Sequence, residues 1–188
     1  MQPFLYMLSM LDKHIEKKLF DYEDLIKPIK EIGDSISKKF NGEKIVLVCV
    51  LKGAITFYGH LLKYIHGATV ETDYIHVKSY NGTKNNEREV KLIAKHTTNV
   101  TNKNVIIIED IVDTGYTMEF LYEYFKEHGA KTVSSAVLAN KPTARKVKIE
   151  PTWYGIDLPN QYVVGFGFDL HDDLRHLPYI GTLKKEYY

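Results

Sequence analysis

Apolar residues recur along the first third of the chain with the spacing of a helix and then form an unbroken run. The first pattern, with a spacing of three or four, predicts a helix over residues 21–40, with Pro28 in or near its first turn. Its apolar members are Leu25, Ile29, Ile32, Ile36 and Phe40. Residues 45–51 are continuously apolar and rich in β-branched side chains, which predicts a strand buried on both faces.

The same two patterns continue toward the C-terminus. Helical faces are predicted over residues 55–65, ending at Gly67, and over residues 118–125, ending at Gly129. Strands are predicted at residues 69–78, 90–94, 104–108, 133–139 and 162–168, with a polar loop over 81–89 and a polar connection between the last two strands. Strands alternating with helices imply βαβ units, and therefore an α/β fold with a mainly parallel sheet.

Composition and charge narrow the class of protein. The 188 residues carry 25 Lys plus Arg and 24 Asp plus Glu, with 44% hydrophobic residues, so disorder and a disulfide scaffold are poor explanations. We expect a single domain spanning residues 1–188. The near balance of charge argues against a broadly basic nucleic-acid-binding protein.

No segment looks like a targeting or membrane element. The opening MQPFLYMLSM lacks a cationic start and a cleavage site, and the apolar runs are far shorter than a membrane span. The one cysteine, Cys49, lies inside an apolar run, where a buried small side chain is favoured over a nucleophile. We therefore expect a soluble protein of a reducing compartment, the cytoplasm.

The stretch from Val105 to Met118, VIIIEDIVDTGYTM, carries the clearest chemistry. A buried strand ends in two adjacent carboxylates, and a Thr-Gly-x-Thr turn then enters a helix. Ligands of open α/β sheets bind at the carboxyl ends of the strands. Free N–H groups at a helix N-terminus favour a phosphate, and a glycine lets the backbone approach it closely. The predicted phosphate-binding residues are Asp113, Thr114, Gly115, Tyr116 and Thr117.

Carboxylates beside a phosphate would repel it unless they face another group. Glu109 and Asp110 suit the hydroxyls of a ribose, directly or through Mg²⁺, and Asp113 could act as a general base. The alternative is an acidic surface turn in which Asp113 and Thr114 only cap the next helix. Capping does not explain a Glu-Asp pair directly after an apolar strand. The nucleotide-binding motifs GxxxxGK[ST] and GxGxxG are absent from this stretch.

Residues 105–118 closely resemble the diphosphoribose-binding signature of type I phosphoribosyltransferases. The chain from about Leu47 to Gly181 resembles the hypoxanthine-guanine branch, and nothing before about residue 40 contributes. The resemblance implies the fold of that family, with a mainly parallel sheet flanked by helices and a small hood built from the chain ends. It also implies transfer of the phosphoribosyl group from 5-phosphoribosyl 1-diphosphate to hypoxanthine or guanine, with Mg²⁺ as cofactor, by a homodimer or homotetramer.

Further motifs match this family in order along the chain. Leu51-Lys52-Gly53 resembles its diphosphate loop, in which the peptide before the lysine is typically cis. Arg175 matches an arginine that contacts the diphosphate, and Asp169 matches a residue that holds Mg²⁺ on it. Ser79-Tyr80 resembles the Ser-Tyr pair of a closing lid, which would exclude water from a reactive sugar cation.

The resemblance assigns a purine-binding side as well. Lys141 matches the lysine that binds O6 of a 6-oxopurine, Tyr162 a stacking ring, and Val163 a backbone contact to the purine edge; Ile111 and Asp169 are assigned to this side too. Asp113 would accept the N7 proton as N9 attacks. A lysine has donors only, so we expect 6-oxopurines to be preferred over adenine, although the sequence does not rank hypoxanthine, guanine and xanthine.

Two other classes of protein remain open at this point. A phosphoacceptor receiver domain also places acids at strand ends, but it would have no use for the Thr-Gly-x-Thr turn. A phosphoribosyltransferase-like regulator could bind RNA through the basic cluster Arg145, Lys146 and Lys148. We expect no nucleic acid and no membrane as partners.

Overall fold

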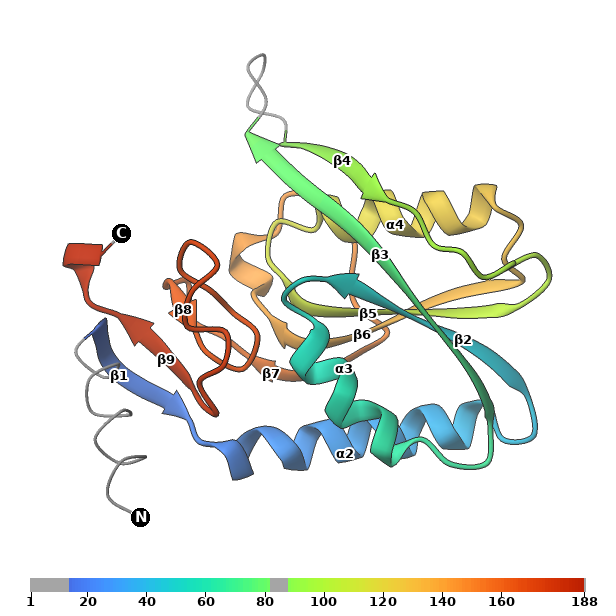
Figure 1. Ribbon diagram of the computed structural model, residues 1–188, viewed down its shortest axis with the longest axis horizontal. Coiled ribbons are helices and arrows are strands. Elements are labelled where there is room, and N and C mark those ends of the chain that lie inside the picture. The colour runs from blue at the N-terminus through green and yellow to red at the C-terminus, as the bar shows by residue number, and fades with distance from the viewer. Residues whose placement is uncertain (1–13, 82–87, 188) are drawn as a thin grey trace.

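Strand β5 lies inside a six-stranded sheet with the order β4-β3-β2-β5-β6-β7 (Figure 1). The structure, a computed structural model, describes residues 14–81 and 88–187. All neighbouring pairs are parallel except β3 with β4, which is antiparallel. The strands are β2 (Lys44–Leu51), β3 (Thr69–Asn81), β4 (Arg88–Ala94), β5 (Asn104–Val112), β6 (Thr132–Asn140) and β7 (Trp153–Asp157). The predicted mainly parallel sheet is confirmed.

Helices cover both faces of this sheet. Helices α2 (Tyr22–Lys39) and α3 (Ile55–Leu61) pack on one face and α4 (Tyr116–Glu127) on the other. In β5, Ile106 and Ile108 belong to the first apolar cluster and Val105 and Ile107 to the second. Because alternate side chains of a strand point to opposite faces, burial on both faces explains the continuous apolar run.

A small antiparallel sheet joins the two ends of the chain. Its order is β1-β9-β8, with β1 (Ile15–Phe20), β8 (Val163–Val164) and β9 (Ile180–Leu183). Figure 1 shows it beside the large sheet, near the carboxyl ends of the parallel strands. It is the predicted hood built from the chain ends. A short 3₁₀ turn, η4 (Lys185–Tyr187), follows β9.

Several details of the predicted elements differ from the structure. The strand predicted over 162–168 is limited to β8, because Gly165, Phe166 and Gly167 have positive φ angles of 92°, 51° and 108° and form a turn. Strand β7 lies in the stretch that was predicted to be only a polar connection. Pro28 is well inside α2 and past its first turn.

Helix α2 begins at a capping contact and contains a proline, and the second predicted helix ends in a 3₁₀ turn. The N–H of Asp21 donates to the carboxylate of Asp24 (2.9 Å) at the start of α2. Pro28 removes the N–H that would donate to the carbonyl of Asp24, and Asp24 is an exposed residue. The helix predicted over 55–65 ends as a 3₁₀ turn, η2 (Leu62–Tyr64).

Among the described residues, no helix is long and apolar enough to cross a membrane.

Candidate active site

Two adjoining cavities open at the carboxyl ends of β2, β5 and β6, where the sequence predicts the site. The first has a volume of about 390 Å³ and the second about 690 Å³. Asp110, Ile111, Asp113 and Asp169 line both cavities. Parallel strands place their carboxyl ends at one edge of the sheet, so residues far apart in the sequence meet here.

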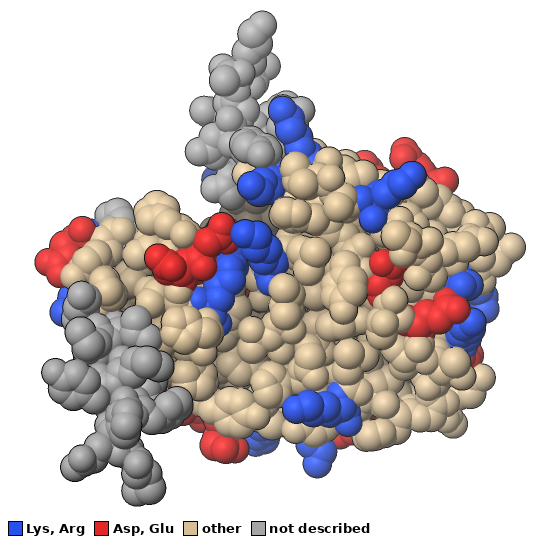
Figure 2. Space-filling view, in the orientation of Figure 1, with Lys and Arg blue, Asp and Glu red and all other residues tan. Residues whose placement is uncertain are grey.

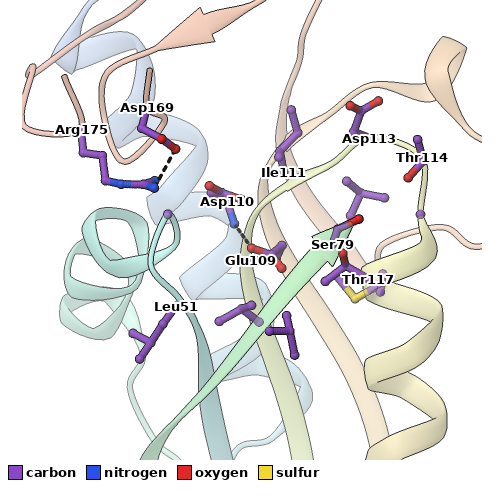
Figure 3. A pocket seen from close by; sticks show the side chains of 16 residues that line it. Leu51, Ser79, Glu109, Asp110, Ile111, Asp113, Thr114, Thr117, Asp169 and Arg175 are labelled. Carbon is purple, nitrogen blue, oxygen red and sulfur yellow. Dashed lines mark hydrogen bonds and ion pairs between the residues drawn. The ribbon is translucent and has the colours of Figure 1, made fainter. Parts of the chain in front are cut away.

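The phosphate-binding loop predicted from the sequence lies at the start of α4. Gly115 precedes this helix with a φ of 94°, a conformation that favours glycine. Thr114, Gly115 and Thr117 line the first cavity together with Asp113 (Figure 3). Tyr116 is half-buried and lines neither cavity, so of this predicted phosphate-binding residue only the backbone is a candidate ligand.

The acid pair lies at the end of β5, between this loop and the hood. Glu109 is 7% exposed, and its Oε1 accepts the backbone N–H of Asp110 at 3.1 Å (Figure 3). Burial raises the pKa of the Glu109 carboxyl well above its usual value, and the neighbouring Asp110 raises it further. Burial also raises the pKa of Asp110, against the lowering effects of the backbone N–H of Ile111 and the charge of Arg175. The pair would gain from a hydroxyl donor or a cation.

The predicted diphosphate loop approaches the acid pair from the end of β2. The Leu51–Lys52 peptide is cis, as the resemblance implies. Leu51 and Gly53 line the first cavity. A Cβ built on Gly53 would overlap the Asp110 carboxylate, so only a glycine lets this backbone lie so close to the acid.

Arg175 faces the same cavity from the hood side. Its Nη2 lies 2.7 Å from Oδ1 of Asp169 (Figure 3). Its Nη1 donates to the carbonyl of Gly167 at 2.7 Å. Its Nε is buried and has no hydrogen-bond partner in the described part of the chain. Both Asp169 and Arg175 line the first cavity, so their ion pair is part of the site.

Sequence reasoning missed Asp172. Its carboxylate lies 3.0 Å from Nζ of Lys52 and 3.0 Å from Nη2 of Arg175. No local pattern indicated these contacts, because Asp172 lies in an irregular turn with a φ of 71°, where the helical rule for residues three positions apart does not apply. Lys52 itself lines neither cavity, since its side chain turns to Asp172 at the outer edge.

The second cavity contains the predicted purine-binding residues. Lys141 is 8% exposed, and its Nζ donates to the carbonyl of Gln161 at 2.8 Å. Burial lowers the pKa of Lys141, opposed by the charge of Asp113. Tyr162 and Val163 line this cavity with Lys141. Lys185, from the C-terminal 3₁₀ turn, lines it too, and no sequence pattern pointed to it.

The remaining predicted residues fall at the margins of the site. Ser79 lines the first cavity from β3. Tyr80 lies on β3 opposite Glu89, but its side chain and residues 82–87 of the predicted lid lie outside the described residues. Cys49 is fully buried in the core, and burial, with the nearby acids, raises the pKa of its thiol to about 12. It is therefore not a nucleophile.

The carboxylates fit Mg²⁺ in a particular way. Within residues 14–81 and 88–187, no three His, Cys, Asp or Glu side chains form a group that could hold a metal ion. Mg²⁺ usually takes one or two protein carboxylates and completes its shell with substrate phosphates and water. The Glu109–Asp110 pair and Asp169 fit that donor chemistry, and all three line the first cavity.

Comparison with known proteins gives consistent matches along the chain. Residues 17–173 match the phosphoribosyl transferase domain family. The hypoxanthine-guanine phosphoribosyltransferase of Streptococcus thermophilus is 43% identical over 179 residues, covering 95% of this chain and 99% of that protein. Its counterpart in Streptococcus agalactiae is 41% identical over the same coverage. The match at residue 17 corrects the predicted lower limit of about residue 40, because β1 and α2 belong to the hood and the core.

Solved structures extend the likeness to the fold. A hypoxanthine phosphoribosyltransferase from Staphylococcus aureus superposes with a TM-score of 0.90 at 35% identity, covering 95% of this chain and 97% of that one. A ternary substrate complex of hypoxanthine phosphoribosyltransferase from Trypanosoma cruzi gives a TM-score of 0.87 at 28% identity, covering 94% and 99% of the two chains.

Proposed function

The chain belongs to the phosphoribosyltransferase domain family, in its hypoxanthine-guanine branch, and from this premise we propose how its two cavities divide the reaction. The activity is hypoxanthine-guanine phosphoribosyltransferase, a glycosyl transfer of purine salvage. The 5-phosphoribosyl group passes from 5-phosphoribosyl 1-diphosphate to hypoxanthine or guanine, which gives IMP or GMP and diphosphate. The sugar diphosphate would occupy the first cavity and the base the second.

One observation carries this assignment: Asp113 lines both cavities. It is the first residue of the loop that would bind the 5′-phosphate, and it shares the second cavity with Lys141. A group in that place can meet the base while the sugar is held beside it. We assign Asp113 as the general base that accepts the N7 proton of the purine.

The 5′-phosphate would be bound by the turn that precedes α4. The backbone N–H groups of residues 113–117 and the hydroxyls of Thr114 and Thr117 supply the donors. Glycine at position 115 allows the left-handed backbone of this turn, with a φ of 94°. Glu109 and Asp110 would accept hydrogen bonds from the ribose hydroxyls, which suits an acid pair whose pKa values are raised by burial.

The leaving diphosphate would meet donors on the hood side of the first cavity. Arg175 contributes its guanidinium and Lys52 its backbone N–H, beside the close backbone at Gly53. Glu109, Asp110 and Asp169 are the residues that would hold Mg²⁺, which supplies neutralisation of the charge that develops on the diphosphate. The C1–O bond breaks through an oxocarbenium-like state, N9 forms the new bond to C1, and the diphosphate carries the bond electrons away.

The second cavity would select the base. Lys141 donates to O6 of a 6-oxopurine and has no acceptor for the amino group of adenine. Tyr162 would stack on the purine ring, while the backbone at Val163 meets its edge; Ile111 and Asp169 line the same cavity.

A diphosphate-release assay tests this function. The activated sugar and Mg²⁺ are supplied with hypoxanthine, guanine, xanthine or adenine in parallel. We expect release with hypoxanthine and guanine and little with adenine. Equal release with all four bases, or none with the 6-oxopurines, would contradict the assignment.

The family resemblance also supports a homodimer or homotetramer, which we propose as the assembly, and a cytoplasmic location. Sedimentation of the purified chain would test the first of these. A chain that sediments as a monomer at assay concentrations would contradict it.

A further inference from the structure

The segment from Arg145 to Ile149 packs directly beneath the phosphate loop. A Cβ built on Gly115 would lie 2.7 Å from a methyl group of Val147, 2.7 Å from one of Ile149 and 3.1 Å from Cδ of Arg145. The N–H of Lys146 donates to the carbonyl of Thr114 at 2.9 Å. Because Gly115 has no side chain, the backbone of the phosphate loop packs directly against residues 145–149.

The guanidinium of Arg145 makes two contacts that reach different parts of the site. Nη1 donates to the backbone carbonyl of Asp113 at 2.7 Å, and Nη2 donates to Oδ1 of Asn140 at 2.5 Å. Only 10% of the side chain is exposed, and the carboxylate of Glu150 is 3.7 Å from Nη2. A planar fork of donors can hold two acceptors at once in a fixed relation.

These two acceptors belong to residues at the neighbouring ends of β5 and β6, beside the proposed purine cavity. Asp113 is the proposed base, and Asn140 directly precedes Lys141, the proposed O6 ligand. The N–H of Lys141 also donates to the carbonyl of Val112 at 3.0 Å. Two neighbouring cross-links thus join the end of β5 to the end of β6, and Arg145 supplies the one at the catalytic loop.

The neighbouring cations do not share this position. Lys146 and Lys148 are exposed, so their ammonium groups are available to water, whereas the Arg145 guanidinium is buried against backbone and amide oxygens. On the face shown in Figure 2, cationic and anionic side chains are interspersed and no large patch of one sign forms. The burial of Arg145 removes it from the basic cluster that could have bound RNA.

We propose that Arg145 is a positioning residue for phosphoribosyl transfer: its guanidinium fixes the backbone of Asp113 relative to Lys141, so that the base and the O6 ligand meet the same purine. This inference rests on the proposed function. Misplacement of a reacting group by about 1 Å can lower a rate by about 100-fold. Loss of the Arg145 guanidinium should therefore slow the chemical step, because it would displace Asp113.

A double-mutant cycle with Asp113 tests this role. R145Q removes the charge and the fork, R145K keeps the charge and loses the fork, and K148Q removes an exposed charge as the matched control. We expect R145Q to lower kcat about 100-fold, with R145K only partly restoring it and K148Q unchanged. The KM for the sugar diphosphate should change less than about threefold.

The decisive comparison is made in the D113N background. If Arg145 acts through Asp113, adding R145Q to D113N should lower kcat less than about threefold further. An additive loss of about 100-fold there would overturn the proposal, as would a wild-type rate in R145Q. Thermal midpoints show whether each variant folds; if R145Q does not fold, R145K in both backgrounds decides. Failure of the wild-type chain to release diphosphate would instead refute the proposed function.

Discussion

Replacement of Lys141 by methionine tests the purine side of the site. Lys141 is 8% exposed, and its Nζ donates to the carbonyl of Gln161 at 2.8 Å, which leaves further N–H groups for a ligand. A hydrogen bond from a charged donor contributes about 1.5–3 kcal/mol. Loss of that bond corresponds to a decrease of roughly 10- to 150-fold in kcat/KM for a 6-oxopurine.

The selectivity between bases gives a second readout. In K141M, kcat/KM for hypoxanthine should fall by about 10- to 150-fold, while the value for adenine should change little, because methionine removes a donor that adenine does not use. K141Q should raise adenine relative to hypoxanthine further, since its amide oxygen can accept from the 6-amino group. Diphosphate release measured with both bases yields the ratio directly.

Stability and selectivity can be separated in this experiment. K141M leaves the carbonyl of Gln161 without the donor that Lys141 supplies, so the thermal midpoint of the K141M variant should fall. K148M, a change at an exposed lysine, is the control and should keep both the midpoint and the base ratio. An equal loss of activity for hypoxanthine and adenine, or a loss of less than about threefold for hypoxanthine, would refute the assignment of Lys141 to O6.

Three other perturbations give distinct outcomes. D113N should lower kcat about 100- to 10,000-fold with a small change in KM, and unchanged turnover in steady-state assays would exclude Asp113 as the base. G53A places a methyl group against the Asp110 carboxylate and should raise the KM for 5-phosphoribosyl 1-diphosphate, whereas the control G59A, at a position open to solvent, should not; identical kinetics of the two variants would contradict this account. Burial and the neighbouring His128 hold the pKa of His96 below its usual 6.5. As the pH drops, His96 is therefore protonated in the unfolded chain before it is protonated in the folded chain. The free energy of unfolding should consequently fall as the pH drops below 6.5. Denaturant unfolding across that range should show a shallower fall in H96Q, and an equal fall would exclude His96 as the source.

The central strands could be predicted because helices cover both faces of the large sheet. Every position of β5 from Val105 to Ile108 is fully buried, so its sequence is apolar without alternation. The equally apolar run 162–168 was predicted wrongly as one strand. Gly165 and Gly167 were the available signal, since both take positive φ angles of 92° and 108° that a strand cannot accommodate.

Two of the missed strands, β1 and β7, share a physical cause. Strand β7 is the edge of the large sheet and pairs only with β6, and β1 is an edge of the hood. Edge strands have fewer buried positions, so their hydrophobic pattern is weak. The pairing of β1 with β9 also joins opposite ends of the chain, a contact that no local pattern can indicate.

The acids of the site could be predicted because one strand determines their position. Glu109 and Asp110 lie near the carboxyl end of β5, which extends to Val112, and a polar side chain at the carboxyl end of an interior parallel strand lies near the ligand site. The position of these acids along β5 does not determine how far they lie from residues of other elements. The close approach of Gly53 to Asp110 depends on how β2 and β5 lie side by side, and the ion pairs of Asp172 depend on the hood.

The position of Arg145 could not be predicted from the sequence. In the sequence it is one of three basic residues with Lys146 and Lys148, and each alone would be assigned to a solvated surface. The chain turns back beneath Gly115 after η3 (Pro142–Ala144), and this turn buries the first cation and leaves the other two exposed. Because all three carry the same charge, only the tertiary contact with the phosphate loop distinguishes the cation that can position Asp113 from those that cannot.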